Sequence, residues 1–155
     1  SRSLLGFRSQ FMTDTRGTGL LNVNFLNYQP YKGDIPVRTK GSLVSMEAGS
    51  VTAYALDGLQ ARGILFVKPG DKVYEGQIVG EHSRDNDLVV NPCKGKKLTN
   101  MRASGTDDAV KLPPVREMEL ERCMEWIRPD ELIEVTPIAI RLRKRILNEG
   151  ARKRA

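Results

Sequence analysis

The sequence predicts an α+β fold, and three patterns support this class. Residues 118–127 carry apolar side chains at the three- and four-residue spacing of an amphipathic helix. Residues 64–83 contain two apolar segments joined by a Pro-Gly-Asp turn, which is typical of successive strands. Residues 138–146 alternate apolar and basic side chains, as in a strand with one buried face. Together these patterns indicate helices and strands in a chain of 155 residues.

The N-terminal residues 1–33 are expected to form a separate piece. Apolar side chains at helical spacing predict a helix over 3–12, and strict alternation of apolar residues with asparagine predicts a strand over 21–25. The two prolines and the glycine of residues 29–36 predict a linker. A second domain is therefore expected over 34–155. One helix and one strand cannot bury both their faces, so we expect exposed apolar side chains on the strand.

The second domain is expected to begin with a strand over 41–46 and a helix over 51–62. Ser50 is the predicted N-cap of that helix and Gly63 its C-terminal stop. The remaining strands are expected over 64–83, 87–90, 131–136 and 138–146. Beyond Asn148 the sequence predicts no packed element.

The positive charge of the chain is concentrated in two places. The formal net charge is +6, and residues 141–155 contain seven basic residues and one acidic residue, so this basic tail accounts for the whole excess. A second concentration of +4 lies at 94–102. Two basic clusters on an otherwise balanced chain favour a polyanionic partner. In the predicted strand at 138–146, the arginines stand on one exposed face and form a candidate second phosphate contact.

The basic loop, residues 91–107, is the strongest candidate site. It carries four cations and two glycines with no acidic residue from Leu88 to Thr106, and its hydroxyl and amide side chains can donate to phosphate or 2′-hydroxyl oxygens. No aromatic residue lies between 75 and 125, so contact with structured RNA is favoured over base stacking. An acidic protein partner and a loop without a partner remain alternatives. The candidate residues are Lys94, Lys96, Lys97, Thr99, Asn100, Arg102 and Ser104.

The sequence gives little support to catalysis or metal binding. The Gly-Lys pair at 95–96 lacks the remaining residues of a phosphate-binding loop. His82 is the only histidine and with Cys93 supplies too few ligands for structural zinc, so a hydrogen-bonded, structural His82 is expected. An enzyme that uses Cys93 with His82 is a third hypothesis. Cys93 and Cys123 are expected to be free thiols. No apolar segment approaches the roughly 18 residues of a membrane span, and no signal peptide is evident.

Several strings resemble the C-terminal part of the BipA/TypA family of ribosome-associated translational GTPases. They include "GFRSQFMTDTRGTG", "GEHSRDNDL", "KGKKLTN", "RASGTD" and "DELIEVTPIAIRLRKRIL". The resemblance extends over essentially the whole chain. It implies that residues 1–33 are the last helix and strand of a ferredoxin-like domain shared with elongation factor G, called domain V. It implies that 34–155 form a mixed α/β domain specific to the family.

The resemblance also implies a function. The parent protein would be a GTPase that binds the 70S ribosome in the cytoplasm, or in a plastid stroma, and supports ribosome assembly and stress adaptation. Its basic loop would contact 23S rRNA and the acceptor end of an A-site tRNA. GTP and magnesium would bind in an N-terminal domain that is missing here, so no catalysis and no cofactor are expected in this chain. Further RNA contacts are expected from Arg84, Arg141, Arg143, Lys144 and Arg145.

Overall fold

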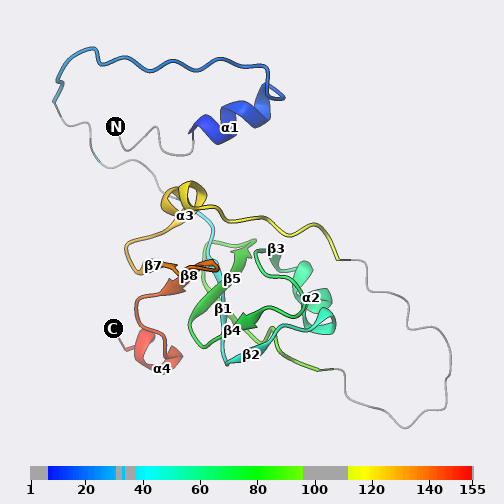
Figure 1. Cartoon of the computed structure of the whole chain (residues 1–155). Helices are drawn as coiled ribbons and strands as arrows, with labels where there is room; N and C mark the ends of the chain where they lie inside the picture. The colour runs from blue at the N-terminus through cyan, green and yellow to red at the C-terminus, as the bar shows by residue number, and fades with distance from the viewer. Residues whose placement is uncertain (1–6, 31–32, 34–37, 96–111, 155) are drawn as a thin grey trace, which may run out of the picture.

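The computed structural model describes residues 7–30, 33, 38–95 and 112–154. Its elements confirm the α+β class, with short helices and a mixed sheet (Figure 1). The division of the chain at residues 33 and 34 stays a prediction. Within the described residues, no helix is both long and apolar enough to cross a bilayer.

A six-stranded sheet forms the centre of the second domain. The strand order is β6-β1-β5-β8-β7, and β3 also pairs with β5. β5 is the middle strand and is buried along its whole length. It runs antiparallel to β1, β3 and β8, whereas β1 and β6 are parallel. The strands are β1 (Ser42–Ser45), β3 (Gly63–Leu65), β5 (Gln77–His82), β6 (Leu88–Val90), β7 (Glu131–Val135) and β8 (Ile140–Lys144).

Strands are present within 64–83, as predicted, but there are three of them, and their bounds differ from the prediction. The turn occurs at Gly70, which has a φ of +93°, and β4 (Lys72–Val73) follows it. β4 does not pair with β3; it pairs with β2 (Gly49–Ser50) in a separate two-stranded sheet. β5 then returns to pair with β3.

Helix α2 (Ala53–Gln60) begins and ends at different residues from those predicted. Thr52 is the N-cap, and its hydroxyl accepts a hydrogen bond from the Ala55 N–H at 3.1 Å. Ser50 is not the cap because it belongs to β2. Gly63 is not a helix stop because it starts β3, where a Cβ would lie 1.9 Å from the backbone oxygen of Glu81. Glycine is needed there for close strand approach.

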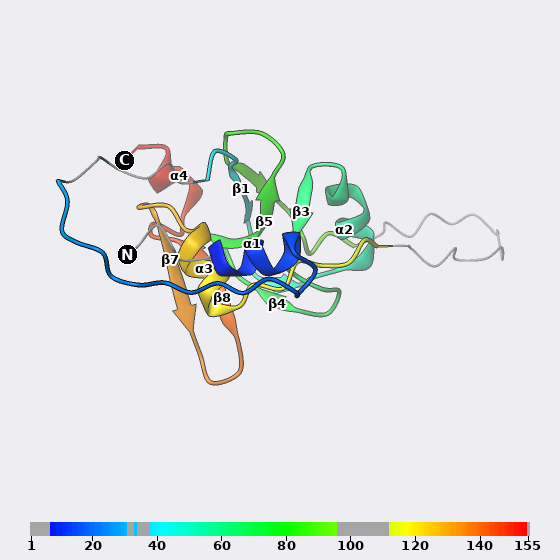
Figure 2. The same cartoon turned by 90° about the horizontal axis from the view of Figure 1, so that it is seen from above.

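Two hydrophobic clusters hold two of the helices on the sheet. The larger cluster packs Leu56 of α2 against side chains of β1, β3, β5 and β6. The smaller one packs Cys123 and Trp126 of α3 (Leu120–Trp126) against Ile78 and Leu142. Figures 1 and 2 show α2 and the β7–β8 hairpin on opposite sides of the domain. The predictions of α3, β7 and β8 are confirmed.

Both ends of the chain differ from the sequence expectations. The N-terminal helix is confirmed as α1 (Phe7–Asp14), but the strand predicted at 21–25 is absent, since residues 18–30 have no regular structure. A strand needs a hydrogen-bonded neighbour, and none is described for this segment. Its apolar side chains are exposed as expected, with Leu20 91% and Tyr28 94% exposed. At the other end, a short helix α4 (Glu149–Arg152) is present where no element was predicted.

Candidate nucleic-acid interface

The backbone that enters the basic loop is fixed to the domain as far as Lys94. β6 pairs with β1, and the Thr52 N–H then donates to the Pro92 carbonyl at 3.0 Å. The Thr52 hydroxyl donates to the Lys94 carbonyl at 2.6 Å. The Lys94 side chain is exposed and makes no hydrogen bond or ion pair with another described residue. Among the described residues nothing neutralises its charge, which lies at the edge of an anchored backbone.

The residues that follow the loop are anchored as well. Leu112 packs against the larger hydrophobic cluster, and the Arg116 N–H donates to the Leu65 carbonyl at 3.0 Å. The Arg116 guanidinium lies 3.0 Å from the Glu81 carboxylate, which also accepts the Trp126 indole N–H at 3.0 Å. Both flanks of the loop are thus tied to the same sheet.

Glu81 stays charged in this arrangement. Burial on its own would raise the pKa of the carboxyl, but the hydrogen bond from Trp126 and the charges of Arg116 and Lys40 hold the pKa below its ordinary value. The Lys40 ammonium lies 3.5 Å from the other carboxylate oxygen. An ionised Glu81 can therefore hold the returning chain through Arg116 at neutral pH.

Most of the predicted loop contacts lie outside the described residues. Of the predicted contact residues, only Lys94 lies in the described part of the basic loop, residues 91–95. The predictions for Lys96, Lys97, Thr99, Asn100, Arg102 and Ser104 fall outside it.

A second basic surface lies at the end of the sheet where β3 starts and β5 ends. The Ser83 N–H donates to the Arg62 carbonyl at 2.9 Å, and the Gly41 N–H donates to the Arg84 carbonyl at 2.7 Å. These backbone bonds hold Arg62 near the turn that contains Arg84. Both guanidinium groups are exposed and unpaired among the described residues. Arg84 was predicted; Arg62 was missed because it stands alone in the sequence, at the end of a helix.

A sequence profile of the TypA/BipA C-terminal domain matches residues 40–149, which include both flanks of the loop. The chain belongs to the TypA/BipA family. Proteins named large ribosomal subunit assembly factor BipA from Salmonella typhimurium and Escherichia coli (strain K12) are each 57% identical over 156 residues, covering 100% of this chain and 26% of the relative. The Haemophilus influenzae protein of that name is 54% identical, covering 100% and 25%. The chain spans about a quarter of these curated relatives.

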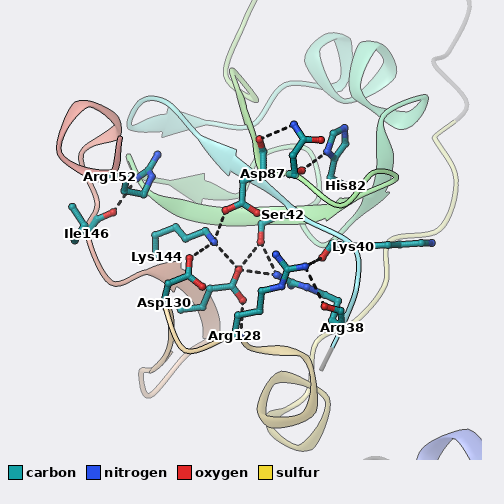
Figure 3. A network of polar contacts seen from close by, with 12 residues as sticks. Arg38, Lys40, Ser42, His82, Asp87, Arg128, Asp130, Lys144, Ile146 and Arg152 are labelled. Carbon is teal, nitrogen blue, oxygen red and sulfur yellow. Dashed lines mark hydrogen bonds and ion pairs between the residues drawn. The ribbon is translucent and has the colours of Figure 1, made fainter. Parts of the chain in front are cut away.

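One of the cations that were predicted to contact RNA is buried inside the domain. Lys144 is only 1% exposed, and its ammonium lies 2.5 Å from Asp87, 2.7 Å from Asp130 and 2.9 Å from Glu131 (Figure 3). Burial alone would lower the pKa of Lys144, but hydrogen bonds to the three carboxylates raise it. The prediction that Lys144 presents its charge to a ligand is wrong, because that charge is neutralised inside the domain.

The buried cluster around Lys144 continues into β1 and the preceding chain. The Arg38 guanidinium lies 2.8 Å from Glu131, and the Ser42 hydroxyl donates to the same carboxylate at 2.6 Å. The Arg128 guanidinium donates to three successive carbonyls of residues 38–40, which Figure 3 shows beside the cluster. This network fixes Asp87, the residue before β6, and so helps to define where the basic loop starts.

The three arginines beside Lys144 that were predicted to contact RNA are more accessible. Arg141 forms an ion pair with Glu134 on the neighbouring strand at 3.6 Å, and both side chains are partly exposed. Arg143 is also partly exposed, and its closest polar contact is a carbonyl at 3.5 Å. Arg145 is exposed, and its backbone N–H donates to the Asp130 carbonyl at 2.8 Å. The predicted contacts of all three with RNA stay predictions.

The described residues do not support the hypothesis of an enzyme that uses Cys93 with His82. His82 is buried, and its Nδ1 lies 2.6 Å from the Asn86 carbonyl, which confirms the structural histidine expected from the sequence. Burial raises the pKa of Cys93, so its nucleophilic thiolate is disfavoured at neutral pH. Cys123 is buried, which raises its pKa to about 11. Both thiols are free, and no cluster of metal-ligating side chains occurs among the described residues.

Proposed function

We propose that this chain is the ribosome-contacting RNA-binding module of a translational GTPase that acts in large-subunit assembly. Its basic loop, residues 91–107, binds 23S rRNA and the acceptor end of an A-site tRNA. The observation that carries the proposal is a concentration of +4 within nine residues, at 94–102, on a loop whose two flanks are anchored to one sheet. The relatives' name, large ribosomal subunit assembly factor, supports a ribosomal target.

Anchored flanks favour binding because they reduce what must be ordered on association. Each long side chain that a ligand immobilises costs conformational entropy, and a backbone that is already fixed adds little to that cost. Lys94 starts the loop at such a point. Phosphate contacts position a protein on RNA without reading its sequence, so a loop of lysines, arginines and neutral donors fits a structured RNA surface.

In this proposal the chain contributes binding and no catalysis. GTP and Mg²⁺ bind in the part of the parent protein that lies outside this chain, which spans 26% of its relatives. The parent acts on 70S ribosomes in the cytoplasm and supports translation under stress. Arg84, Arg141, Arg143 and Arg145 supply further phosphate contacts at the edges of the domain.

The test measures how the affinity of the full-length protein for 50S subunits depends on salt. Four neutralised phosphates give a slope of log K against log salt of about −3 to −3.6. Replacing Lys94, Lys96 and Lys97 together with alanine removes three of these contacts and should make the slope of the full-length protein less steep by about 2 to 2.7. The charge-matched control replaces Arg8, Lys68 and Arg122, which lie outside both basic clusters, and should leave the slope close to that of the unsubstituted protein.

Equal slopes for the loop variant and the parent would overturn the proposal, because the cations would then not neutralise phosphate. A competition experiment separates RNA from an acidic protein partner. Deacylated tRNA and a 23S rRNA fragment should displace the full-length protein from 50S subunits, whereas poly-glutamate of the same charge should compete far less well. The reverse order would favour the protein partner.

A further inference from the structure

A groove of about 520 Å³ runs between α2 and β6, next to the point where the basic loop starts. Its size is within the range of small-ligand sites. Figures 1 and 2 both show α2 beside the described end of the chain before the loop. The groove is lined by Tyr54, Leu59, Arg62, Leu88, Asn91 and Lys94, among others.

The two cations of the groove lie at opposite ends of α2. The Thr52 hydroxyl, at the N-cap, donates to the Lys94 carbonyl, so Lys94 is at the start of the helix. Arg62 lies just past the last residue of the helix. Eight helical residues span about 12 Å, so the backbones of the two cationic residues stand near opposite ends of a helix of that length. Neither side chain is paired with another described residue.

The groove is also lined by an aromatic ring and by apolar side chains. Tyr54 is 47% exposed, and its ring makes no aromatic or cation–π contact with another described residue. Leu59 and Leu88 are partly buried against the larger hydrophobic cluster below it. The aromatic residue that the loop sequence lacks is therefore supplied by a helix forty residues earlier in the chain.

Polar groups in the groove complete a site for a nucleotide. The Asn91 side-chain oxygen accepts the Cys93 N–H at 2.9 Å, which leaves the Asn91 NH₂ free to donate. Asp57 is the only acidic residue of the lining, and its carboxylate accepts from Gln60 at 2.8 Å with lone pairs to spare. It can accept from a ribose hydroxyl or a base amino group.

We propose that this groove holds one unpaired nucleotide of a structured RNA. The base stacks on Tyr54, the Asn91 amide donates to the base edge or the ribose, and the two flanking phosphates contact Lys94 and Arg62. Two cations against one carboxylate, with an exposed ring in the same groove, match a phosphate-base-phosphate unit better than an acidic peptide, which has no base to stack. This inference rests on the proposed RNA-binding function.

The experiment measures the affinity for two RNA hairpins that are identical except that one carries a bulged 2-aminopurine. Both the 155-residue chain and the full-length protein are tested. The unsubstituted protein should bind the bulged hairpin at least about fivefold more tightly and quench its fluorescence through stacking, since one stacked base is worth at least about that factor. Tyr54→Leu should abolish both effects, whereas Tyr54→Phe, which keeps the ring, should retain them. Arg62→Ala should reduce the salt slope by about 1 for the bulged hairpin only.

The outcomes separate this inference from the proposed function. If Tyr54→Leu keeps the preference and the quenching while Lys96→Ala/Lys97→Ala loses affinity for both hairpins, the groove is not the nucleotide site and the proposed function stands. If neither variant changes RNA affinity, both proposals fail. If poly-glutamate binding depends on Arg62 and the bulge has no effect, the groove is a protein site. Tyr54 is half exposed, so an unchanged unfolding midpoint is expected for both Tyr54 variants.

Discussion

Replacing Lys144 with methionine should destabilise the second domain strongly, although the residue belongs to a basic cluster in the sequence. Methionine fills a similar volume but removes the ammonium that contacts Asp87, Asp130 and Glu131. Removing one partner of a buried ion pair typically costs about 3–5 kcal/mol, because the remaining charge is left without compensation.

The structure indicates the lower end of that range. The carboxylates of Asp87 and Asp130 are 35% and 61% exposed, so water can solvate them once the ammonium is gone. Glu131 is fully buried but keeps Arg38 at 2.8 Å and the Ser42 hydroxyl at 2.6 Å. We therefore expect a loss of about 3 kcal/mol in the free energy of unfolding, equivalent to a Tm lower by about 10 °C for a domain of this size.

Urea unfolding followed by tryptophan fluorescence measures this loss directly. Trp126 is the only tryptophan, and it lies in the smaller hydrophobic cluster, in van der Waals contact with the Arg38 guanidinium. A double-mutant cycle with Glu131→Gln should give a coupling energy above about 1 kcal/mol. Without urea the variant is folded, and the slope of its log K for RNA against log salt should equal that of the unsubstituted protein. A loss below about 0.5 kcal/mol, or a slope reduced by about 1, would refute the buried position of Lys144.

Two further predictions concern the sheet and its pH dependence. Gly63→Ala should lower the free energy of unfolding by about 1–3 kcal/mol, since the new methyl meets a β5 carbonyl. Gly58→Ala on α2, where nothing lies within 4 Å of the new methyl, should raise the free energy of unfolding. The midpoints of urea unfolding of the two variants test both expectations. The pKa of Asp87 is held below its ordinary value: burial would raise it, but hydrogen bonds from the buried lysine and a backbone N–H lower it. Its contribution is complete above the unfolded-state pKa of about 3.9 and is lost as the pH falls through the lower folded-state pKa, so the stability difference between the parent and Asp87→Asn should shrink from pH 5 to pH 2. A difference that stays constant over that range would contradict the assignment.

Local spacing predicted the elements whose partners lie close in the sequence. The helix at 118–127 and the strands at 131–136 and 138–146 are found as α3, β7 and β8. The two strands form a hairpin and pair with each other, so their alternation is satisfied within about fifteen residues. The predicted strand at 21–25 has the same alternation and failed, because alternation records a buried face but does not supply the neighbouring strand that makes a ladder.

Lys144 could have been placed correctly from the sequence. Residues two apart on a strand share a face, so Lys144 stands on the same side as Leu142, which is buried in the smaller cluster. The positive charge of Lys144 groups it with the neighbouring arginines, but its position on the strand places its side chain on the buried face. The Tyr54 contribution to the groove had no comparable signal, because the hydrogen bonds from Thr52 that join the start of α2 to Pro92 and Lys94 link residues far apart in the sequence.

The distribution of ion pairs explains how a domain can present a strongly basic loop without neutralising it. Glu81 and Glu131 are each bound to buried or partly buried cations of the domain, and Asp87 is bound to Lys144. These carboxylates lie in or beside the strands that precede or support the loop, where they would otherwise attract its lysines. Each of these three carboxylates already has a cationic partner at 3.0 Å or less, so its charge is compensated within the domain. We therefore expect these three carboxylates to compete little with an external anion for the loop cations, as the proposed phosphate binding requires.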